Sequence, residues 1–405
     1  MARLKRKMFS LYRWREKARE VGRVIKLPKD VRTEYFKDNF GIINTDPGCQ
    51  AAVESSIAWL CEAQDNNLFG DGGVADTYSL ITGWGPSYPE TTGYIIPTLI
   101  EYGCLKGDEK FLGRAKRMLD WLCAIQFPDG SFQGGVIGTQ PLQPTVFNTG
   151  QIVMGFAAGA TKFGEAYRLN LVRAADWLVK VQDADGAWRK FESPFVEHGD
   201  KTYHAHVAWG LMEAEKIEPG RNYGASALKH IQWALSHQKP NGWFANCDLN
   251  MPSQPLTHTL GYVLRGVVEA QLFSPNLEFL KASRLTADAF LDVMEKDGYI
   301  AGRFFDNWRP AEDWVCLTGT VQIAICWLLL YRITGDQKYR DAAFVANRYV
   351  RMRMSVNGPE HKRGGIKGSY PVNGYYGTFA YLNWAAKFFV DANLLELQVR
   401  SNESA

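Results

Sequence analysis

The stretch DWLVKVQDADGAW, residues 176–188, contains the pattern that decides the fold. Trp177 is followed five residues later by Gln182, and then by the turn Asp185-Gly186 and an aromatic residue. The same Trp-to-Gln spacing recurs in AWLCEAQ (58–64), DWLCAIQ (120–126) and QWALSHQ (232–238). Turn signals at 129, 185, 241 and 297 are 56 residues apart, and the next, at 357, follows after 60. A fixed period of this length indicates a repeat architecture.

A second kind of segment lies between each turn and the next Trp–Gln segment. It is apolar nearly all round, which is typical of a helix buried on both sides, whereas the Trp–Gln segments carry charges on one face. These apolar segments span 94–102, 151–162, 207–216, 260–272, 321–333 and 379–395. Most of the amphipathic segments are opened by an aromatic residue at the same period: Phe111, Tyr167, Tyr223, Phe279 and Tyr339.

Six buried helices alternating with six amphipathic ones predict an all-α fold, an (α/α)6 toroid with an inner and an outer ring of helices. An open solenoid would permit any number of repeats and would need polar end caps, whereas six hairpins can close on themselves. We therefore expect one toroid domain over residues 45–405, preceded by a basic N-terminal extension over residues 1–44.

The repeated pattern Q-x-x-D-G-x-W/F resembles the motif of terpenoid cyclases and protein prenyltransferases. The six-hairpin architecture is similar to that of six-hairpin glycosidases, uronate lyases and sugar epimerases. The resemblance implies the toroid fold and a structural role for the motif, in which the aromatic residue and Gln brace neighbouring hairpins. It does not choose between isoprenoid and glycan chemistry, because one fold supports many functions.

Isoprenoid chemistry makes specific demands that the sequence meets poorly. The terpenoid cyclases of the protonation type that the repeat resembles carry a D-x-D-D motif. The nearest string here, residues 183–186, ends in Gly186 instead of Asp. A prenyltransferase would hold zinc with Asp, Cys and His. Asp313, Cys316 and His361 provide those residue types, but the Asp and Cys are three positions apart where the family has two.

The composition and charge of the chain exclude several classes. With 46% hydrophobic and 22% charged residues, the 405-residue chain is typical of a globular protein. Its longest apolar run, residues 323–331, is too short for a bilayer span. Residues 1–29 carry a net charge of +9, so the rest carries −6. An acidic body does not favour nucleic-acid binding.

The N-terminal arm and the cysteines indicate where in the cell the protein is expected. The arm mixes Lys and Arg with aromatic residues, so it is either a solvated extension or a segment that contacts an anionic membrane surface peripherally. The arm lacks the apolar segment that follows the charges in a secretory signal. Seven scattered cysteines without a C-x-x-C pair fit reduced thiols. We expect a cytoplasmic protein, with possible membrane association through residues 1–29.

The connections that lead into the inner helices are predicted to crowd one mouth of the barrel and to supply the site. They are rich in groups that bind hydroxyls, which suits an oligo- or polysaccharide. Glycoside hydrolysis needs two carboxyl groups, and the candidates are Glu90 with Asp313, or Asp76 with Asp313. Uronate elimination or C5 epimerisation needs a proton-abstracting side chain, for which the candidates are Tyr203, His204 and Tyr375.

The predicted substrate-binding residues are the aromatic, amide, imidazole and guanidinium groups of the same connections. They are Trp84, Tyr88, Asn148, Gln151, His206, His258, Arg303, Arg309, Trp314 and Tyr370. Structural roles compete with some of these assignments, since Glu90 could stabilise a helix N-terminus and His206 could be a core residue. His204 and His206 are two apart and do not share a helical face, so no metal site is expected. No phosphate-binding glycine loop is present, and no cofactor is expected.

The sequence thus predicts a glycan-active enzyme that uses general acid/base chemistry, with glycoside hydrolysis favoured. Uronate lyase or C5-epimerase activity, isoprenoid cyclase or prenyltransferase-like activity, and non-catalytic glycan binding remain alternatives. The sequence leaves the sugar, the linkage and the oligomeric state open.

Overall fold

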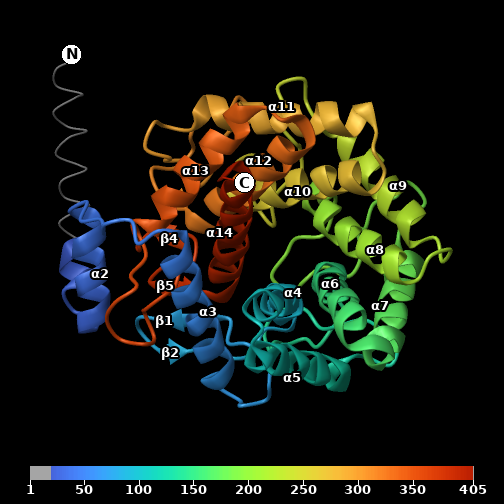
Figure 1. Cartoon of the computed structure of the whole chain (residues 1–405), viewed down its shortest axis with the longest axis horizontal. Helices are drawn as coiled ribbons and strands as arrows, with labels where there is room; N and C mark the ends of the chain where they lie inside the picture. Colours follow the sequence, from blue (N-terminus) through green and yellow to red (C-terminus); the bar gives the residue numbers. More distant parts are fainter. Residues whose placement is uncertain (1–19, 405) are drawn as a thin grey trace.

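A computed structural model describes residues 20–404 and shows two concentric rings of helices (Figure 1). The inner helices contact one another in chain order, and α14 contacts α4, which closes the ring. This confirms the predicted (α/α)6 toroid. The inner ring consists of α4 (Pro89–Lys106), α6 (Val146–Phe163), α8 (Ala205–Ile217), α10 (Thr257–Phe273), α12 (Leu317–Thr334) and α14 (Asn383–Ser404). The outer ring consists of α3 (Cys49–Asp65), α5 (Glu109–Ile125), α7 (Arg168–Val181), α9 (Tyr223–Leu235), α11 (Leu277–Val293) and α13 (Gln337–Arg351).

The last inner helix pairs with the first outer helix, which joins the two ends of the toroid. Five inner helices pack against the outer helix that follows them, but α14 packs against α3, so the sixth hairpin joins the two ends of the body. Two short 3-10 helices, η1 (Gly164–Tyr167) and η2 (Thr202–His204), precede α7 and α8. All inner helices therefore start at one end of the barrel and finish at the other.

The repeated glutamines brace neighbouring hairpins, as the sequence predicts. Gln182 Nε2 donates to the carbonyl of Gly186 in its own turn at 2.9 Å and to that of Ser226 on α9 at 3.0 Å. Gln126 makes the equivalent bonds to Gly130 and Asn170. Each glutamine thus joins a turn to the next outer helix. Leaving such a donor without its acceptor would lower the stability of the fold.

The aromatic residues that open the outer helices form a second set of repeated contacts. The hydroxyl of Tyr223 donates to Asp176 on the preceding outer helix at 2.6 Å, and Tyr167 donates to Asp120 at 2.7 Å. Both acceptors directly precede the tryptophan of the repeat. The period of 56 residues is therefore the period of these bonds between hairpins.

Glycines allow the inner helices to approach closely. A Cβ added to Gly210 on α8 would lie 2.4 Å from the carbonyl oxygen of Gly150 on α6, and one on Gly266 would lie 2.3 Å from that of Ala205. Because these neighbours are backbone atoms within a packed ring, they cannot move away cheaply.

Replacing Gly210 by Val is expected to lower the free energy of unfolding by about 1–3 kcal/mol, the usual cost of overpacking a core. Chemical denaturation monitored by circular dichroism measures the change. Gly113→Val on the outer helix α5 is the matched control, because a side chain there meets nothing within 4 Å. Equal stability of the two variants would contradict close packing of the inner ring.

Short strands tie the first and sixth connections together. β1 (Thr77–Ser79) lies between β2 (Gly83–Trp84) and β5 (Ala380–Leu382), with both pairs antiparallel and Tyr78 opposite Trp84 and Tyr381. β3 (Val315–Cys316) pairs with β4 (Ser369–Tyr370) in the same antiparallel sense. These pairs fix the loops at the end of the barrel where the inner helices begin.

The described part of the N-terminal extension packs on the sixth connection. Helix α2 (Lys29–Asn39) buries Val31 and Tyr35 in the hydrophobic core. Its Asp38 accepts hydrogen bonds from Lys367 Nζ at 2.6 and 2.8 Å and from the amide of Val372 at 2.9 Å. Residues 20–44 are therefore attached to the toroid, whereas residues 1–19 of the predicted membrane-contacting arm lie outside the described residues.

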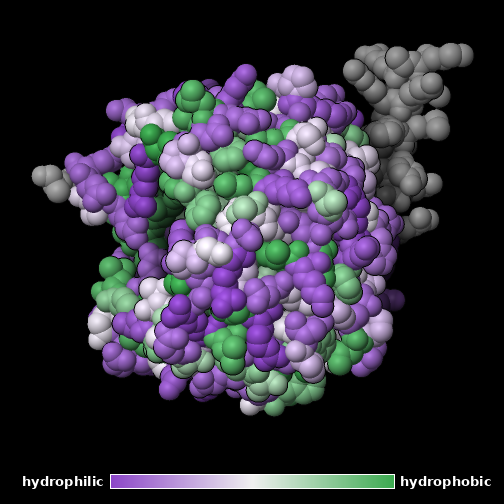
Figure 2. Space-filling view, turned by 90° about the vertical axis from the view of Figure 1, so that its right-hand side faces the viewer, coloured by the Kyte–Doolittle hydropathy of each residue, from purple (hydrophilic) through white to green (hydrophobic). Residues whose placement is uncertain are grey.

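Within residues 20–404, one helix, α12, is long and apolar enough to cross a membrane by length and composition. It is an inner-ring helix, and 72% of it is buried inside the protein. Its contacts with α10, α13 and α14 explain its composition. The face of the molecule seen in Figure 2 is largely hydrophilic, with apolar side chains scattered among the polar ones.

Candidate functional site

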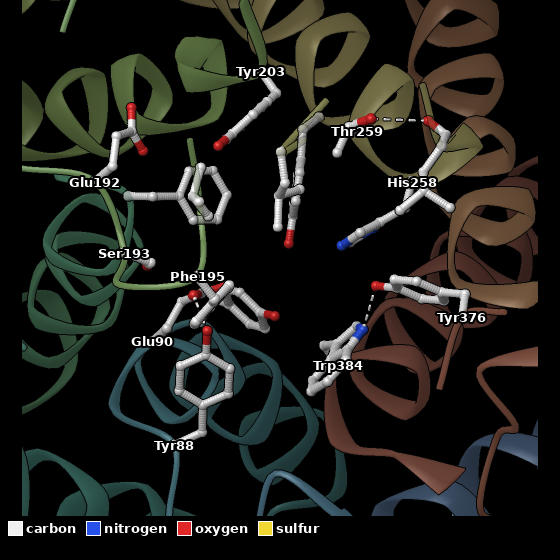
Figure 3. Close-up of a pocket in the computed structure, with 16 residues that line it drawn as sticks. Tyr88, Glu90, Glu192, Ser193, Phe195, Tyr203, His258, Thr259, Tyr376 and Trp384 are labelled. Carbon is white, nitrogen blue, oxygen red and sulfur yellow. Dashed lines mark hydrogen bonds between the residues drawn. The ribbon is translucent and has the colours of Figure 1, made fainter. Parts of the chain in front are cut away.

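A cavity of about 220 Å³ opens where the inner helices begin (Figure 3). Its walls come from the first turns of α4, α6, α10 and α14 and from the connections that precede the inner helices. Eight of its sixteen lining residues are aromatic, and two are glutamates. They are Tyr88, Glu90, Tyr94, Phe147, Glu192, Ser193, Phe195, Val196, Tyr203, Leu249, Leu256, His258, Thr259, Tyr262, Tyr376 and Trp384.

Glu90 lies in the first turn of α4 and is 7% exposed. The Tyr88 hydroxyl donates to its Oε2 at 2.7 Å. Burial raises the pKa of Glu90 to about 7, and the hydrogen bond from Tyr88 opposes that rise because it favours the ionised carboxylate. No side-chain hydrogen bond caps the start of α4. Glu90 lines the cavity, so it can contact a ligand there.

Glu192 lies in the connection between α7 and η2 and is 1% exposed. Its Oε1 has no hydrogen-bond partner among the described residues and lies 3.7 Å from Nε2 of His204. Burial raises the pKa of Glu192 to about 8, against the attraction of Lys201. The same cause holds the pKa of His204 well below its usual value. Glu192 is thus protonated at neutral pH beside an uncharged imidazole.

The raised pKa of Glu192 makes stability depend on pH. The folded protein keeps the Glu192 proton up to about pH 8, whereas the unfolded chain releases it near its ordinary pKa of 4.5. Raising the pH through this window therefore favours unfolding. Glu192→Gln is expected to raise the melting temperature relative to the unsubstituted protein, and by more at pH 8 than at pH 5.

Thermal unfolding at the two pH values measures this difference. Glu197→Gln, at an exposed carboxyl of the same connection, is the control and is expected to change the melting temperature equally at both. A Glu192→Gln effect that is independent of pH would show that Glu192 is ionised in the folded protein.

The His258 ring points into the cavity from the side opposite to the two glutamates (Figure 3). Its Nδ1 lies 2.7 Å from Oε1 of Gln322, so Nδ1 carries the proton and the lone pair is on Nε2. Burial lowers the pKa of His258 to about 4. The side chain is consequently a neutral imidazole at pH 7, able to accept a proton.

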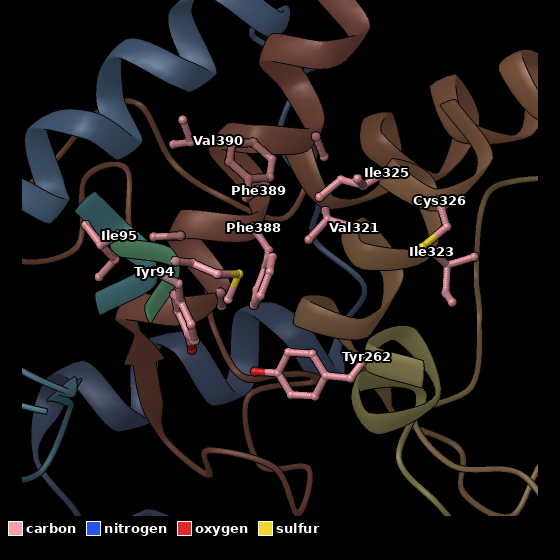
Figure 4. Packing of buried hydrophobic residues seen from close by; sticks show 14 of the residues in the cluster. Tyr94, Ile95, Tyr262, Val321, Ile323, Ile325, Cys326, Phe388, Phe389 and Val390 are labelled. Atoms are coloured by element: carbon pink, nitrogen blue, oxygen red, sulfur yellow. The ribbon is translucent and has the colours of Figure 1, made fainter. Parts of the chain in front are cut away.

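The floor of the cavity is made by aromatic residues in the middle of the barrel. The hydroxyls of Tyr94 and Tyr262 point toward one another beside Phe388 (Figure 4). Tyr94 also lines a second cavity, of about 410 Å³, at the other end of the barrel. The Tyr94 ring therefore separates the two ends.

Four of the predicted residues meet in the cavity: Tyr88, Glu90, Tyr203 and His258. His204 is fully buried behind Glu192. The other predicted catalytic residues lie elsewhere. Asp313 is exposed, Asp76 is half-buried next to Thr77, and Tyr375 is 84% exposed. The predicted carboxyl pairs with Asp313 are therefore not formed, and Glu90 is accompanied by Glu192 instead.

The remaining predicted binding residues have structural contacts outside the lining of the cavity. Four of them are in the connections between helices: Trp84 in β2 packs on Tyr78, Arg303 pairs with Asp248, exposed Arg309 covers Phe305, and Tyr370 in β4 lies under Arg353. The others are buried. Asn148 donates to the Gln133 carbonyl, Gln151 and His206 bond to each other at 2.6 Å, and Trp314 packs with Leu256 and Cys316. His206 is therefore a buried core residue, the structural role that competed with substrate binding in its assignment.

Glu192 and six aromatic residues of the lining were not selected from the sequence: Tyr94, Phe147, Phe195, Tyr262, Tyr376 and Trp384. Tyr376 is the immediate neighbour of the predicted Tyr375, and its hydroxyl accepts from Trp384 Nε1 at 2.8 Å. Tyr94 and Tyr262 each lie about one turn along an inner helix from a predicted residue, Glu90 and His258 respectively. That spacing of four residues is the signal that could have found them. Among residues 20–404, no group of three or more His, Cys, Asp and Glu side chains could hold a metal ion.

Comparisons with known proteins agree with the fold. The family model of the squalene-hopene cyclase C-terminal domain matches residues 86–268, less than half of the chain. A sequence comparison with curated proteins finds no significant match.

Solved structures match over most of the chain. An unsaturated glucuronyl hydrolase specific for heparin has a TM-score of 0.71 at 15% identity, covering 88% of this chain and 99% of that one. A D-mannose isomerase has a TM-score of 0.69 at 11% identity, covering 87% and 97%. Cellobiose 2-epimerase from Bacillus thermoamylovorans has a TM-score of 0.67 at 14% identity, covering 86% and 98%. These similarities show that the chain is an (α/α)6 toroid.

Proposed function

We propose that the protein is a carbohydrate-active enzyme that hydrolyses a glycosidic bond with Glu192 as general acid and Glu90 as general base or nucleophile. The observation that carries the proposal is the pair of buried carboxyls in one cavity, with pKa values raised to about 8 and about 7. Glycoside hydrolysis uses two carboxyl groups, one as acid and the other as base or nucleophile, and of these two Glu90 accepts a hydrogen bond from Tyr88 that favours its ionised form.

Each carboxyl has contacts that suit its role. Glu192 lines the cavity and is protonated at neutral pH, so it can donate its proton to the oxygen of the leaving group. Glu90 accepts a hydrogen bond from Tyr88, which favours the ionised form that activates water or attacks the anomeric carbon. The water supplies the hydroxyl that ends on the sugar, and its proton balances the one that Glu192 gave.

The structural neighbours support the substrate class. Glucuronyl hydrolases, a mannose isomerase and a cellobiose epimerase share the toroid, and one neighbour was solved with the saccharide dGlcA-GalNAc6S. The cavity of about 220 Å³ is also small for a long isoprenoid chain. A glycan substrate is therefore favoured over the isoprenoid alternative, although the family model that matches in part is that of a cyclase domain.

His258 favours a second candidate, an epimerase or isomerase. A neutral imidazole with its lone pair on Nε2 can remove a proton from the carbon next to a sugar carbonyl, while Glu192 protonates the carbonyl oxygen. The predicted alternative is uronate elimination or C5 epimerisation with a Tyr or His base; this candidate shares with it only the His base, with His258 in the place of His204.

Product analysis in isotopic solvents tests the two candidates together. Hydrolysis is expected to place ¹⁸O from labelled water in a new reducing end, whereas epimerisation or isomerisation in D₂O places deuterium on carbon. Binding of saccharides without either label would identify a non-catalytic toroid. Turnover of isoprenyl diphosphates alone would overturn the glycan assignment.

We further propose that residues 1–29 bring the protein to an anionic membrane surface. Their net charge of +9 supports this, as do exposed Ile25, Phe40, Ile42 and Ile43 on either side of α2. Because Val24 is buried in the core, deletion of residues 1–19 is the sharper test. The deletion is expected to lower co-sedimentation with liposomes that contain anionic lipid, and unchanged sedimentation would rule the contact out.

A further inference from the structure

The cavity contains acidic groups but no fixed positive charge. None of its sixteen described lining residues is Lys or Arg, and its one imidazole is neutral at pH 7. We propose that the site takes a single uncharged sugar ring and rejects the corresponding uronate. This inference rests on the proposed glycan function and names its substrate class.

The cations nearest the cavity are already committed to other partners. Lys201 Nζ donates to the carbonyls of Leu249 at 2.6 Å and Asp248 at 3.2 Å. Arg303 binds the Asp248 carboxylate and the Gln254 carbonyl. Lys387, below the Tyr94 ring, pairs with Asp391 at 2.6 Å. None of these side chains lines the cavity, so none is placed to contact a carboxylate on a bound ring.

A uronate would add a negative charge to a site that already disfavours one. The pKa values of Glu90 and Glu192 are raised because burial penalises a carboxylate there. A substrate carboxylate would bear the same desolvation penalty and would also repel Glu90 in its ionised form. The hydroxymethyl group of a neutral sugar carries no such penalty.

The groups that do line the cavity suit a neutral ring. The hydroxyls of Ser193 and Thr259 and the lone pair of His258 can exchange hydrogen bonds with sugar hydroxyls. Tyr203 and Phe147, with ring centroids 5.3 Å apart, give one wall an apolar surface for a pyranose face. At about 30 Å³ per water molecule the cavity has room for about seven waters, which is the scale of one ring.

Binding of matched sugar pairs tests the proposal. The pairs are the methyl glycosides of glucose and glucuronic acid, galactose and galacturonic acid, and mannose and mannuronic acid, measured by calorimetry. We expect at least one neutral member to bind about tenfold or more tightly than its own uronate, a difference of about 1.4 kcal/mol. Equal or tighter binding of the uronate in the pair that binds best would overturn the proposal.

A charge introduced into the lining provides the second arm. Ser193→Lys is expected to reduce the preference for the neutral member at least about tenfold, because it supplies the missing cation. Ser193→Met has a side chain of similar length without the charge and should keep the preference. An unchanged preference in Ser193→Lys, with the fold intact by circular dichroism, would contradict an electrostatic origin.

The outcomes separate this inference from the proposed function. Hydrolysis of uronides with ¹⁸O incorporation would leave the function standing and remove the neutral-sugar assignment. Absence of both binding and turnover across all pairs and their disaccharides would overturn both. Binding of a neutral ring without turnover would keep the substrate class and remove the catalytic role.

Discussion

Replacing Glu192 by Gln is expected to lower kcat about 10²–10⁴-fold, the usual contribution of a general acid or base. The substitution keeps the size and shape of the side chain but removes the proton that the leaving group needs. It should leave KM within a small factor, because the amide can still contact the sugar. Glu90→Gln is expected to give a loss of the same order, because the amide neither activates water nor attacks carbon.

The structure supplies a matched control for this experiment. Asp313 is a predicted catalytic carboxyl that lies exposed outside the lining of the cavity. Asp313→Asn is expected to retain full activity, and all three variants should keep the helical circular dichroism spectrum. Substantial turnover in both Glu90→Gln and Glu192→Gln would refute the carboxyl pair. A loss confined to His258→Gln would favour the epimerase candidate.

The second large effect is on stability. Lys367→Met is expected to lower the free energy of unfolding by about 3–5 kcal/mol, the usual cost of breaking a buried ion pair on one side. Lys367 and Asp38 are 3% and 4% exposed, and the Asp38 carboxylate also accepts from the amide of Val372. Removing the ammonium group would leave that carboxylate buried without its counter-charge.

Denaturant unfolding measures this cost, and two further variants define its origin. Asp38→Leu combined with Lys367→Met is expected to recover much of the loss, because neither charge then remains buried alone. Lys106→Met breaks an exposed pair with Glu54 and is expected to have little effect on stability, because solvent screens such a pair. If Lys367→Met cost no more than Lys106→Met, α2 would not be held to the body through this pair.

The fold was predictable because its determinants recur along the chain. Gln182 contacts Gly186, which is local in sequence, and Ser226 in the next repeat, and Gln126 repeats both contacts one period earlier, so the pattern in the sequence is the pattern of bonds. The inner glycines follow the same logic: Gly155, Gly210 and Gly266 are nearly one period apart and lie where inner helices meet.

The site was only partly predictable, because its residues do not follow the repeat. The position of Asp313 seemed equivalent to that of Glu90, at the start of an inner helix. Residues Val315 and Cys316 instead form β3, so α12 begins only at Leu317 and Asp313 stays in the exposed loop. The extended pairing of β3 with β4 joins segments more than fifty residues apart, and no local pattern reports it.

The sequence also could not predict which side chains of a connection point into the cavity. Tyr375 and Tyr376 are adjacent and identical in type, yet only Tyr376 enters the cavity, where Trp384 donates to its hydroxyl. Glu192 is one of several polar residues in a connection without a motif. Its significance follows from burial and an unpaired oxygen, which are properties of the assembled protein.

The joining of α14 to α3 has a consequence for biosynthesis. The ring cannot close on the ribosome until the last 22-residue helix, α14, has emerged from the exit tunnel, some three hundred residues after its partner. Trp384 lies in that helix, and Tyr376 lies just before it. A nascent chain that has formed only its first five hairpins therefore still lacks one wall of the cavity, and the cavity is complete only once α14 has packed against α3.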